Sequence, residues 1–341
     1  MTPAIFGCSG PSLTADERAF FREADPAGYI LFGRNCIDRE QLRALTDDLR
    51  ALHGRERLLI SIDQEGGRVA RLRPPHWGAY PTGEAFARLY SVAPASAIQA
   101  ARLSARAMAL ELSAMGITVD YHPPLDLRMA SAHDVIGDRA FGEDPVQVAA
   151  IGRAVLEGLA EGGVAGCIKH MPGHGRSMVD SHREMPTVRE SADELERDLA
   201  PFRALACSAR IGMTGHLLFP IWDEENPATL SPRIITEVIR GSIGFEGLLL
   251  TDDIDMEALT DTIPERSARA IAAGCDVVLN CWAKMDDMTG ICEALPAMDD
   301  EALTRLDRAL EETCVAEAMG SEHADLIAER DALLALTGEH A

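Results

Sequence analysis

Short apolar runs alternate along the chain with longer stretches whose apolar residues recur at helical spacing. Polar or glycine-rich residues follow each run, an order typical of alternating β-strands and α-helices. Eight runs predict strands over residues 4–8, 28–32, 58–63, 118–122, 166–170, 211–216, 248–252 and 276–281. Eight alternating units favour a closed (β/α)8 barrel, the TIM-barrel architecture.

Helix signals lie between these runs. Residues 97–115 are rich in Ala, Leu and Met and predict a helix of the outer ring. Ser191 followed by Glu194 is a capping-box pattern and predicts the start of another helix. Gly241 is expected to end a helix, because glycine is favoured just after the last helical turn.

The length of the chain, 341 residues, lies within the range that one α/β barrel fills. Aromatic residues are only 5% of the chain, which suits layered α/β packing better than a β-sandwich. We therefore expect one catalytic barrel domain over residues 1–341, with a polar helical tail from about residue 320.

The formal net charge of −23 makes nucleic acid and anionic membrane surfaces poor partners. The first residues carry no basic segment followed by an apolar core, and no run approaches about 20 apolar residues. The eight cysteines are scattered, with no C-x-x-C pair, and we interpret them as buried free thiols. These features predict a cytoplasmic protein; no pattern defines the oligomeric state, and a monomer is favoured.

Polar residues occur where five of the predicted strands end. The carboxyl ends of barrel strands share one face, and barrel enzymes carry their active sites there. We therefore expect a site that combines the side chains of Asp63, His122, Lys169, His170, His216, Asp252 and Asp253.

The segment IDQEGGRVARL contains Asp63 at the end of a strand, followed by Gly66 and Gly67. A carboxylate at this place can accept hydrogen bonds from two sugar hydroxyls, and the glycines allow the backbone to approach a ligand. The alternative is a turn that begins at Asp63, with Arg68 and Arg71 exposed to solvent.

The segment KHMPGHGRSMVDSH brings together hydrogen-bond donors and a candidate acid/base. Lys169 and His170 close a strand and can bind hydroxyl groups. Asp180 can orient His182 and favour its protonated form. A histidine in this state can give a proton to a leaving oxygen and later deprotonate water.

The segment GFEGLLLTDDIDM ends a strand in Asp252, a carboxylate that can attack an anomeric carbon. Asp253 is interpreted either as part of the same site or as a cap of the next helix. Arg139, in IGDRAFGEDP, is either a ligand-binding residue or part of a surface salt bridge.

Together these segments, with LFGRNCIDREQL and PPLDL, resemble glycoside hydrolase family 3, in particular its single-domain bacterial β-N-acetylhexosaminidases. The resemblance extends over nearly the whole chain. It implies that Asp252 is the nucleophile, His182 the acid/base and Asp180 the residue that tunes it. It also implies that the N-acetylglucosamine unit is bound by Asp63, Arg71, Arg139, Lys169 and His170.

The resemblance further implies a retaining exo-β-N-acetylglucosaminidase that acts on cytoplasmic muropeptides containing 1,6-anhydro-N-acetylmuramic acid during peptidoglycan recycling. It implies neither a cofactor nor a metal. A β-glycoside phosphorylase is an alternative, because a neutral His182 would not repel an incoming phosphate.

Two alternatives lie outside this family. His122, His170, His216 and Asp252 could bind zinc in an amidohydrolase-like barrel with Lys169 as a bridge, but the first strand lacks the H-x-H pair of that class. A sugar sensor without activity is disfavoured, because the candidate catalytic residues are all present.

Overall fold

The computed structural model describes residues 1–129, 135–177, 185–317 and 322–338. Its eight strands are all parallel and pair in sequence order to form a closed barrel. The strands are β1 (Thr2–Gly7), β2 (Pro26–Leu31), β3 (Leu59–Ile62), β4 (Val119–Asp120), β5 (Ala165–Met171), β6 (Ile211–Thr214), β7 (Leu248–Asp253) and β8 (Val277–Asn280). Each overlaps one of the predicted strands, so the predicted (β/α)8 barrel is confirmed.

The register of the strands closes the barrel without an open edge. Ile5 of β1 lies opposite Leu279 of β8, where the last strand meets the first. β4 is short, and its Asp120 lies opposite Ile62 of β3 and Gly166 of β5. Closure satisfies the backbone hydrogen-bonding groups that an open sheet would leave unpaired at its edges.

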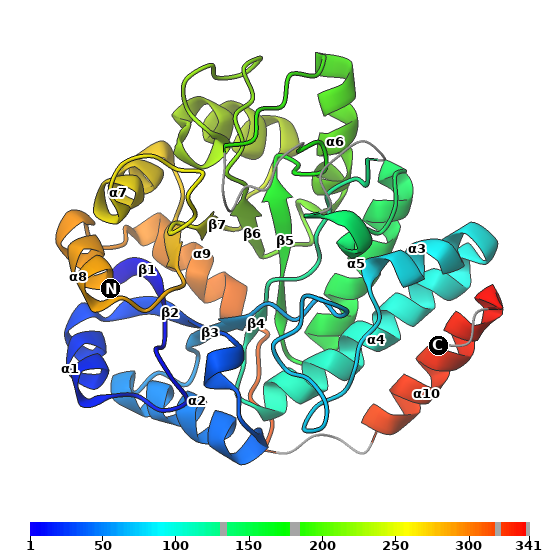
Figure 1. Ribbon diagram of the computed structural model, residues 1–341, viewed down its shortest axis with the longest axis horizontal. Coiled ribbons are helices and arrows are strands. Elements are labelled where there is room, and N and C mark those ends of the chain that lie inside the picture. Colours follow the sequence, from blue (N-terminus) through cyan, green and yellow to red (C-terminus); the bar gives the residue numbers. More distant parts are fainter. Residues whose placement is uncertain (130–134, 178–184, 318–321, 339–341) are drawn as a thin grey trace.

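Helices surround the strands (Figure 1). The α-helices are α1 (Ala15–Ala24), α2 (Arg39–His53), α3 (Gly83–Val92), α4 (Pro94–Ala114), α5 (Pro145–Glu161), α6 (Ala192–Leu205), α7 (Ile263–Ala273), α8 (Met285–Ala294), α9 (Asp300–Leu310) and α10 (His323–Leu334). Short 3-10 helices are η1 (Gly33–Asn35), η2 (Gly137–Arg139), η3 (Ala228–Leu230) and η5 (Ala335–Thr337), and η4 (Ile234–Ile243) is a π-helix. The tail predicted to be helical forms α10, which lies beside α4 in Figure 1.

Local sequence signals explain where several helices begin and end. Ser191 and Glu194 form the predicted capping box at the start of α6. The helix predicted over residues 97–115 is α4, which begins at Pro94. The predicted stop at Gly241 is wrong, because η4 continues to Ile243 and ends at Gly244, where φ is 75°. A glycine within a helix is tolerated at a modest cost, whereas a left-handed residue ends it.

The interior of the barrel forms one apolar cluster with helix α9. Ala302, Leu306 and Leu310 of α9 join the side chains that fill the barrel, such as Val119 and Leu248. The link is fixed by Arg305 of α9, which donates to Asp276 just before β8 at 2.8 Å. Helix α9 therefore closes the amino-terminal end of the barrel, opposite the strand ends that carry the predicted site.

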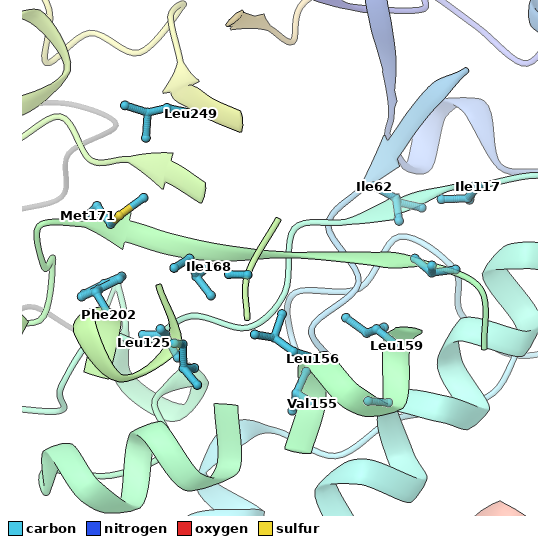
Figure 2. Packing of buried hydrophobic residues seen from close by; sticks show 14 of the residues in the cluster. Ile62, Ile117, Leu125, Val155, Leu156, Leu159, Ile168, Met171, Phe202 and Leu249 are labelled. Carbon is cyan, nitrogen blue, oxygen red and sulfur yellow. The ribbon is translucent and has the colours of Figure 1, made fainter. Parts of the chain in front are cut away.

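A second apolar cluster lies between the strands and the outer helices. Figure 2 shows Ile168 and Met171 of β5 together with Leu156 of α5 and Phe202 of α6. All are buried, and Ile168, Met171 and Phe202 are fully so. This packing holds β5, the strand that carries Lys169 and His170 near its end, against its two neighbouring helices.

The chain has eight free cysteines, as expected, but the prediction that they are buried is only partly correct. Cys8, Cys167, Cys275 and Cys281 are buried, whereas Cys207 and Cys314 are exposed. None of the helices in the described residues combines the length and apolar character that a bilayer-spanning segment requires.

We expect Phe202→Ala to lower the free energy of unfolding by about 3–5 kcal/mol, because it removes a fully buried ring and leaves a cavity. The measurement is denaturant-induced unfolding. Val146→Ala is the control at a site that is 71% exposed, with an expected change within about 0.5 kcal/mol. Equal effects of the two substitutions would contradict the packing described for α6.

Candidate active site

A pocket of about 220 Å³ opens at the carboxyl ends of the strands. Its lining comes from the ends of seven strands and the loops that follow them. The polar lining residues are Asp63, Arg68, Arg71, Tyr121, Arg139, Lys169, His170, His174, Asp252 and Asp253. All five residues predicted to bind sugar, and the predicted nucleophile, therefore lie around one cavity.

Five charged groups form a continuous network along one wall. The Lys169 ammonium lies 3.1 Å from Asp63 Oδ1 and 2.8 Å from Glu65 Oε1. Arg71 Nη2 donates to Asp63 Oδ2 at 3.0 Å. Arg139 donates to both oxygens of Glu65, from Nε at 2.8 Å and from Nη2 at 2.7 Å. Arg139 is thus part of a buried ion pair, not the surface salt bridge considered as its alternative.

The network keeps its acids ionised. Burial opposes ionisation of Glu65, but Arg139 and Lys169 hold the pKa of Glu65 well below its usual value. Burial likewise opposes ionisation of Asp63, and Lys169 and Arg71 lower its pKa. These carboxylates are therefore charged acceptors at neutral pH, and Asp63, which lines the pocket, can accept hydrogen bonds from hydroxyl groups of a ligand.

Asp252 and Asp253 are adjacent in β7, but their surroundings differ. Burial opposes ionisation of Asp252, yet His170, His216 and the backbone N–H of Asp253 hold the pKa of Asp252 at about 2. Burial and the carboxylate of Asp255 raise the pKa of Asp253 to about 8. The surroundings therefore favour the anion of Asp252 and the neutral acid of Asp253.

His170 is held by a buried carboxylate that the sequence analysis did not identify. Its Nδ1 lies 2.7 Å from Asp126 Oδ2, and Asp126 Oδ1 accepts the backbone N–H of His170 and of His174. The His174 ring stands edge-on to the His170 ring, with 5.5 Å between centroids. Burial lowers the pKa of His174 to about 4, so this ring is neutral at neutral pH.

The remaining predicted residues separate into two groups. Asp180 and His182 lie outside the described residues. His122 and His216 do not line the pocket, contrary to expectation. His122 lies in a separate hollow with Glu65 and Arg139, and His216 is buried, with its ring nitrogens bonded to Thr229 Oγ1 and to the carbonyl oxygen of Asp253.

This arrangement does not fit the zinc site considered as an alternative. Both nitrogens of His216 are engaged, and His122 lies in another hollow, so the proposed ligands are not directed to one point. Among the described residues, no group of three or more His, Cys, Asp or Glu side chains is placed to hold a metal ion.

Sequence reasoning missed three residues of the site, although each lies in a segment that it used. Glu65 is in IDQEGGRVARL, Asp126 in PPLDL and His174 in KHMPGHG. Their roles come from partners on other strands, which the spacing of a single segment does not reveal. For Glu65 and Asp126, the one signal in the sequence was an acidic residue close to glycine or proline in a loop that follows a strand.

Comparison with known proteins gives a consistent result. A model of the glycosyl hydrolase family 3 N-terminal domain matches residues 11–312. The beta-hexosaminidase of Bordetella avium is 40% identical over 283 residues, which are 82% of this chain and 80% of that protein. The beta-hexosaminidase of Stenotrophomonas maltophilia is 38% identical over 303 residues, 88% of each.

Solved structures are similar over nearly the whole chain. NagZ from Neisseria gonorrhoeae in complex with N-trifluoroacetyl-D-glucosamine has a TM-score of 0.87 and 32% identity, covering 99% of this chain and 98% of that one. A family 3 β-N-acetylglucosaminidase from Paenibacillus has a TM-score of 0.87 and 30% identity, covering 97% of this chain and 67% of that one.

We expect Glu65→Gln to lower the free energy of unfolding at pH 7 by about 3–5 kcal/mol, because it removes the carboxylate paired with Arg139 and one of the two paired with Lys169. The folded pKa of Glu65 lies below its unfolded pKa. Its contribution is therefore present above about pH 4.3 and is lost as the pH falls toward the folded pKa. Denaturant-induced unfolding at several pH values should show that the difference in free energy of unfolding between wild type and Glu65→Gln becomes smaller at acidic pH.

The control for this substitution is Glu237→Gln. Glu237 pairs with Arg233 at 3.1 Å on the surface, where both side chains are more than half exposed. We expect a loss of less than about 1 kcal/mol. If the Glu65→Gln variant were as stable as this control, the carboxylate of Glu65 would not be needed to stabilise the buried cations of the network.

Proposed function

This chain belongs to glycosyl hydrolase family 3, and from that premise we propose that it is a retaining exo-β-N-acetylglucosaminidase. The observation that carries the proposal is the pocket itself. An ionised Asp252 lies opposite a wall of hydrogen-bonding groups that can hold a sugar. The beta-hexosaminidase relatives support the choice of an N-acetylated sugar over glucose.

The proposed reaction has two steps. In the first, a carboxylate oxygen of Asp252 attacks the anomeric carbon, the glycosidic bond breaks, and His182 gives its proton to the leaving oxygen. In the second, His182 removes a proton from water, and the water oxygen displaces Asp252 from the same carbon. Two inversions retain the β-configuration. Asp180 would orient His182, as its place two residues earlier in the motif suggests.

The same pocket suggests how the sugar is held. Asp63 would accept hydrogen bonds from sugar hydroxyls, and Lys169, Arg71 and Arg139 would donate hydrogen bonds to sugar oxygens. Each of these groups already has an ionic partner in the pocket wall. Such side chains need little reordering when the ligand binds, which favours catalysis by a preorganised site.

The proposed substrate is a cytoplasmic muropeptide with N-acetylglucosamine linked to 1,6-anhydro-N-acetylmuramic acid, as in peptidoglycan recycling. A single catalytic domain over residues 1–341 that acts as a monomer without cofactor is part of the proposal. The neighbouring NagZ structure holds an N-acylated glucosamine, which supports the sugar but not the rest of the substrate.

The first test uses 4-nitrophenyl N-acetyl-β-D-glucosaminide and the matching glucoside. We expect turnover of the N-acetyl sugar only, and a fall in kcat/KM of at least about 10³-fold in Asp252→Ala. Azide should partly restore release in this variant and yield the α-glycosyl azide, because the anion enters on the face that the carboxylate left. Asp16→Ala, in which an exposed carboxyl group is removed, should keep wild-type rates.

Three outcomes would redirect the proposal. Release from neither sugar would overturn the assignment. Full activity of Asp252→Ala would overturn the nucleophile but not the substrate class. Formation of a sugar 1-phosphate in phosphate buffer would replace the hydrolase with a phosphorylase.

A further inference from the structure

Asp126 has no role in the reaction as described so far, yet it is among the most completely engaged carboxylates of the pocket region. It follows β4 and is fully buried. One oxygen accepts two backbone N–H groups, from His170 at 3.2 Å and His174 at 2.7 Å. The other oxygen lies 2.7 Å from His170 Nδ1.

The chemistry of this contact determines where His170 carries its proton. Burial opposes ionisation of Asp126, but His170, His174 and the backbone donors lower its pKa. An ionised carboxylate can only accept hydrogen bonds, so the hydrogen in the short contact must belong to Nδ1. A neutral His170 therefore carries no hydrogen on Nε2.

The second ring nitrogen is directed to the ligand side. His170 lines the pocket, and its Nδ1 is engaged with the protein interior. Within the described residues no protein group forms a hydrogen bond with Nε2. Turning the ring over would break the bond to Asp126 and leave a buried carboxylate without its partner, which is costly.

We propose that Asp126 is a positioning residue that locks His170 in the Nδ1–H tautomer and presents Nε2 to the substrate. In its neutral form His170 then accepts a hydrogen bond from a sugar hydroxyl. In its protonated form it is a cation with a buried counter-ion. While it is neutral, His170 cannot donate a hydrogen bond from Nε2. An imidazole without the Asp126 partner could do so.

A purely structural role for Asp126 makes a different prediction. If Asp126 only tied the β5 turn through its backbone contacts, an asparagine would serve equally well, because its amide oxygen can accept the same two N–H groups. Asparagine would, however, turn its NH2 group toward Nδ1. Nδ1 would then become the acceptor, and the proton would move to Nε2.

The experiment is Asp126→Asn, with the tautomer of His170 read from long-range ¹H–¹⁵N spectra and assigned with His170→Gln. We expect the Nδ1–H form in the wild type and the Nε2–H form in the variant. We expect kcat/KM to fall by about 10- to 100-fold, the range seen when the partner that orients a metal-binding histidine is lost.

Asp276→Asn is the matched control. Asp276 is also buried, accepts a backbone N–H from Leu249 at 2.8 Å and pairs with Arg305, but it lies at the closed end of the barrel. It should lose stability while keeping the wild-type tautomer and kcat/KM.

The spectra and the kinetics separate this proposal from the function on which its kinetic part rests. An Nε2–H form in the wild type, or no change of tautomer in Asp126→Asn, would overturn the positioning role whatever the enzyme hydrolyses. A changed tautomer with unchanged kcat/KM would also overturn it. Absence of turnover in the wild type would refute the proposed function but leave the tautomer assignment standing. The wild-type spectrum decides the tautomer even if the variant does not fold.

Discussion

The ammonium group of Lys169 is buried at the end of β5 and is balanced by two carboxylates that follow β3. Removing a charge from water is costly, and the interior accepts it only with ionic partners. The same two carboxylates hold Arg71 and Arg139, which come from loops after β3 and β4. One buried cation thus links three separate segments into a pocket wall, so the site and the stability of the barrel rim depend on the same contacts.

Neighbouring carboxyl groups of β7 show how surroundings override sequence. Asp252 faces histidine rings and a backbone donor, whereas Asp253 faces the carboxylate of Asp255. At the same pH, these surroundings favour the anion of Asp252 and the neutral acid of Asp253. The proposed retaining mechanism needs an anionic nucleophile, and a second anion beside Asp252 would repel the oxygen atoms of an approaching substrate. Asp252 and Asp253 together therefore carry less negative charge than two acidic residues in the sequence suggest.

The sequence predicted the barrel because its strands are continuous apolar runs, a pattern that depends only on burial. It also predicted Asp63, Lys169 and Asp252 at the pocket, because parallel strands bring their carboxyl ends to one face. Glu65 and Asp126 were not predicted, since their roles depend on partners from distant segments. His122 follows a strand as well but lies in another hollow, because the end of a strand does not by itself define where a side chain points. Asp180 and His182 remain predictions from the motif.

Helix α9 fills the amino-terminal end of the barrel, and side chains fill the interior between this helix and the pocket. In the part of the chain that the structure describes, the cavity is therefore closed at its base. A ligand therefore reaches the pocket from the face that carries the carboxyl ends of the strands and cannot pass through the barrel. In the proposed hydrolysis, the leaving group and the released monosaccharide would both depart through this face. The order in which these two products leave would then depend on the shape of the barrel as well as on the chemistry.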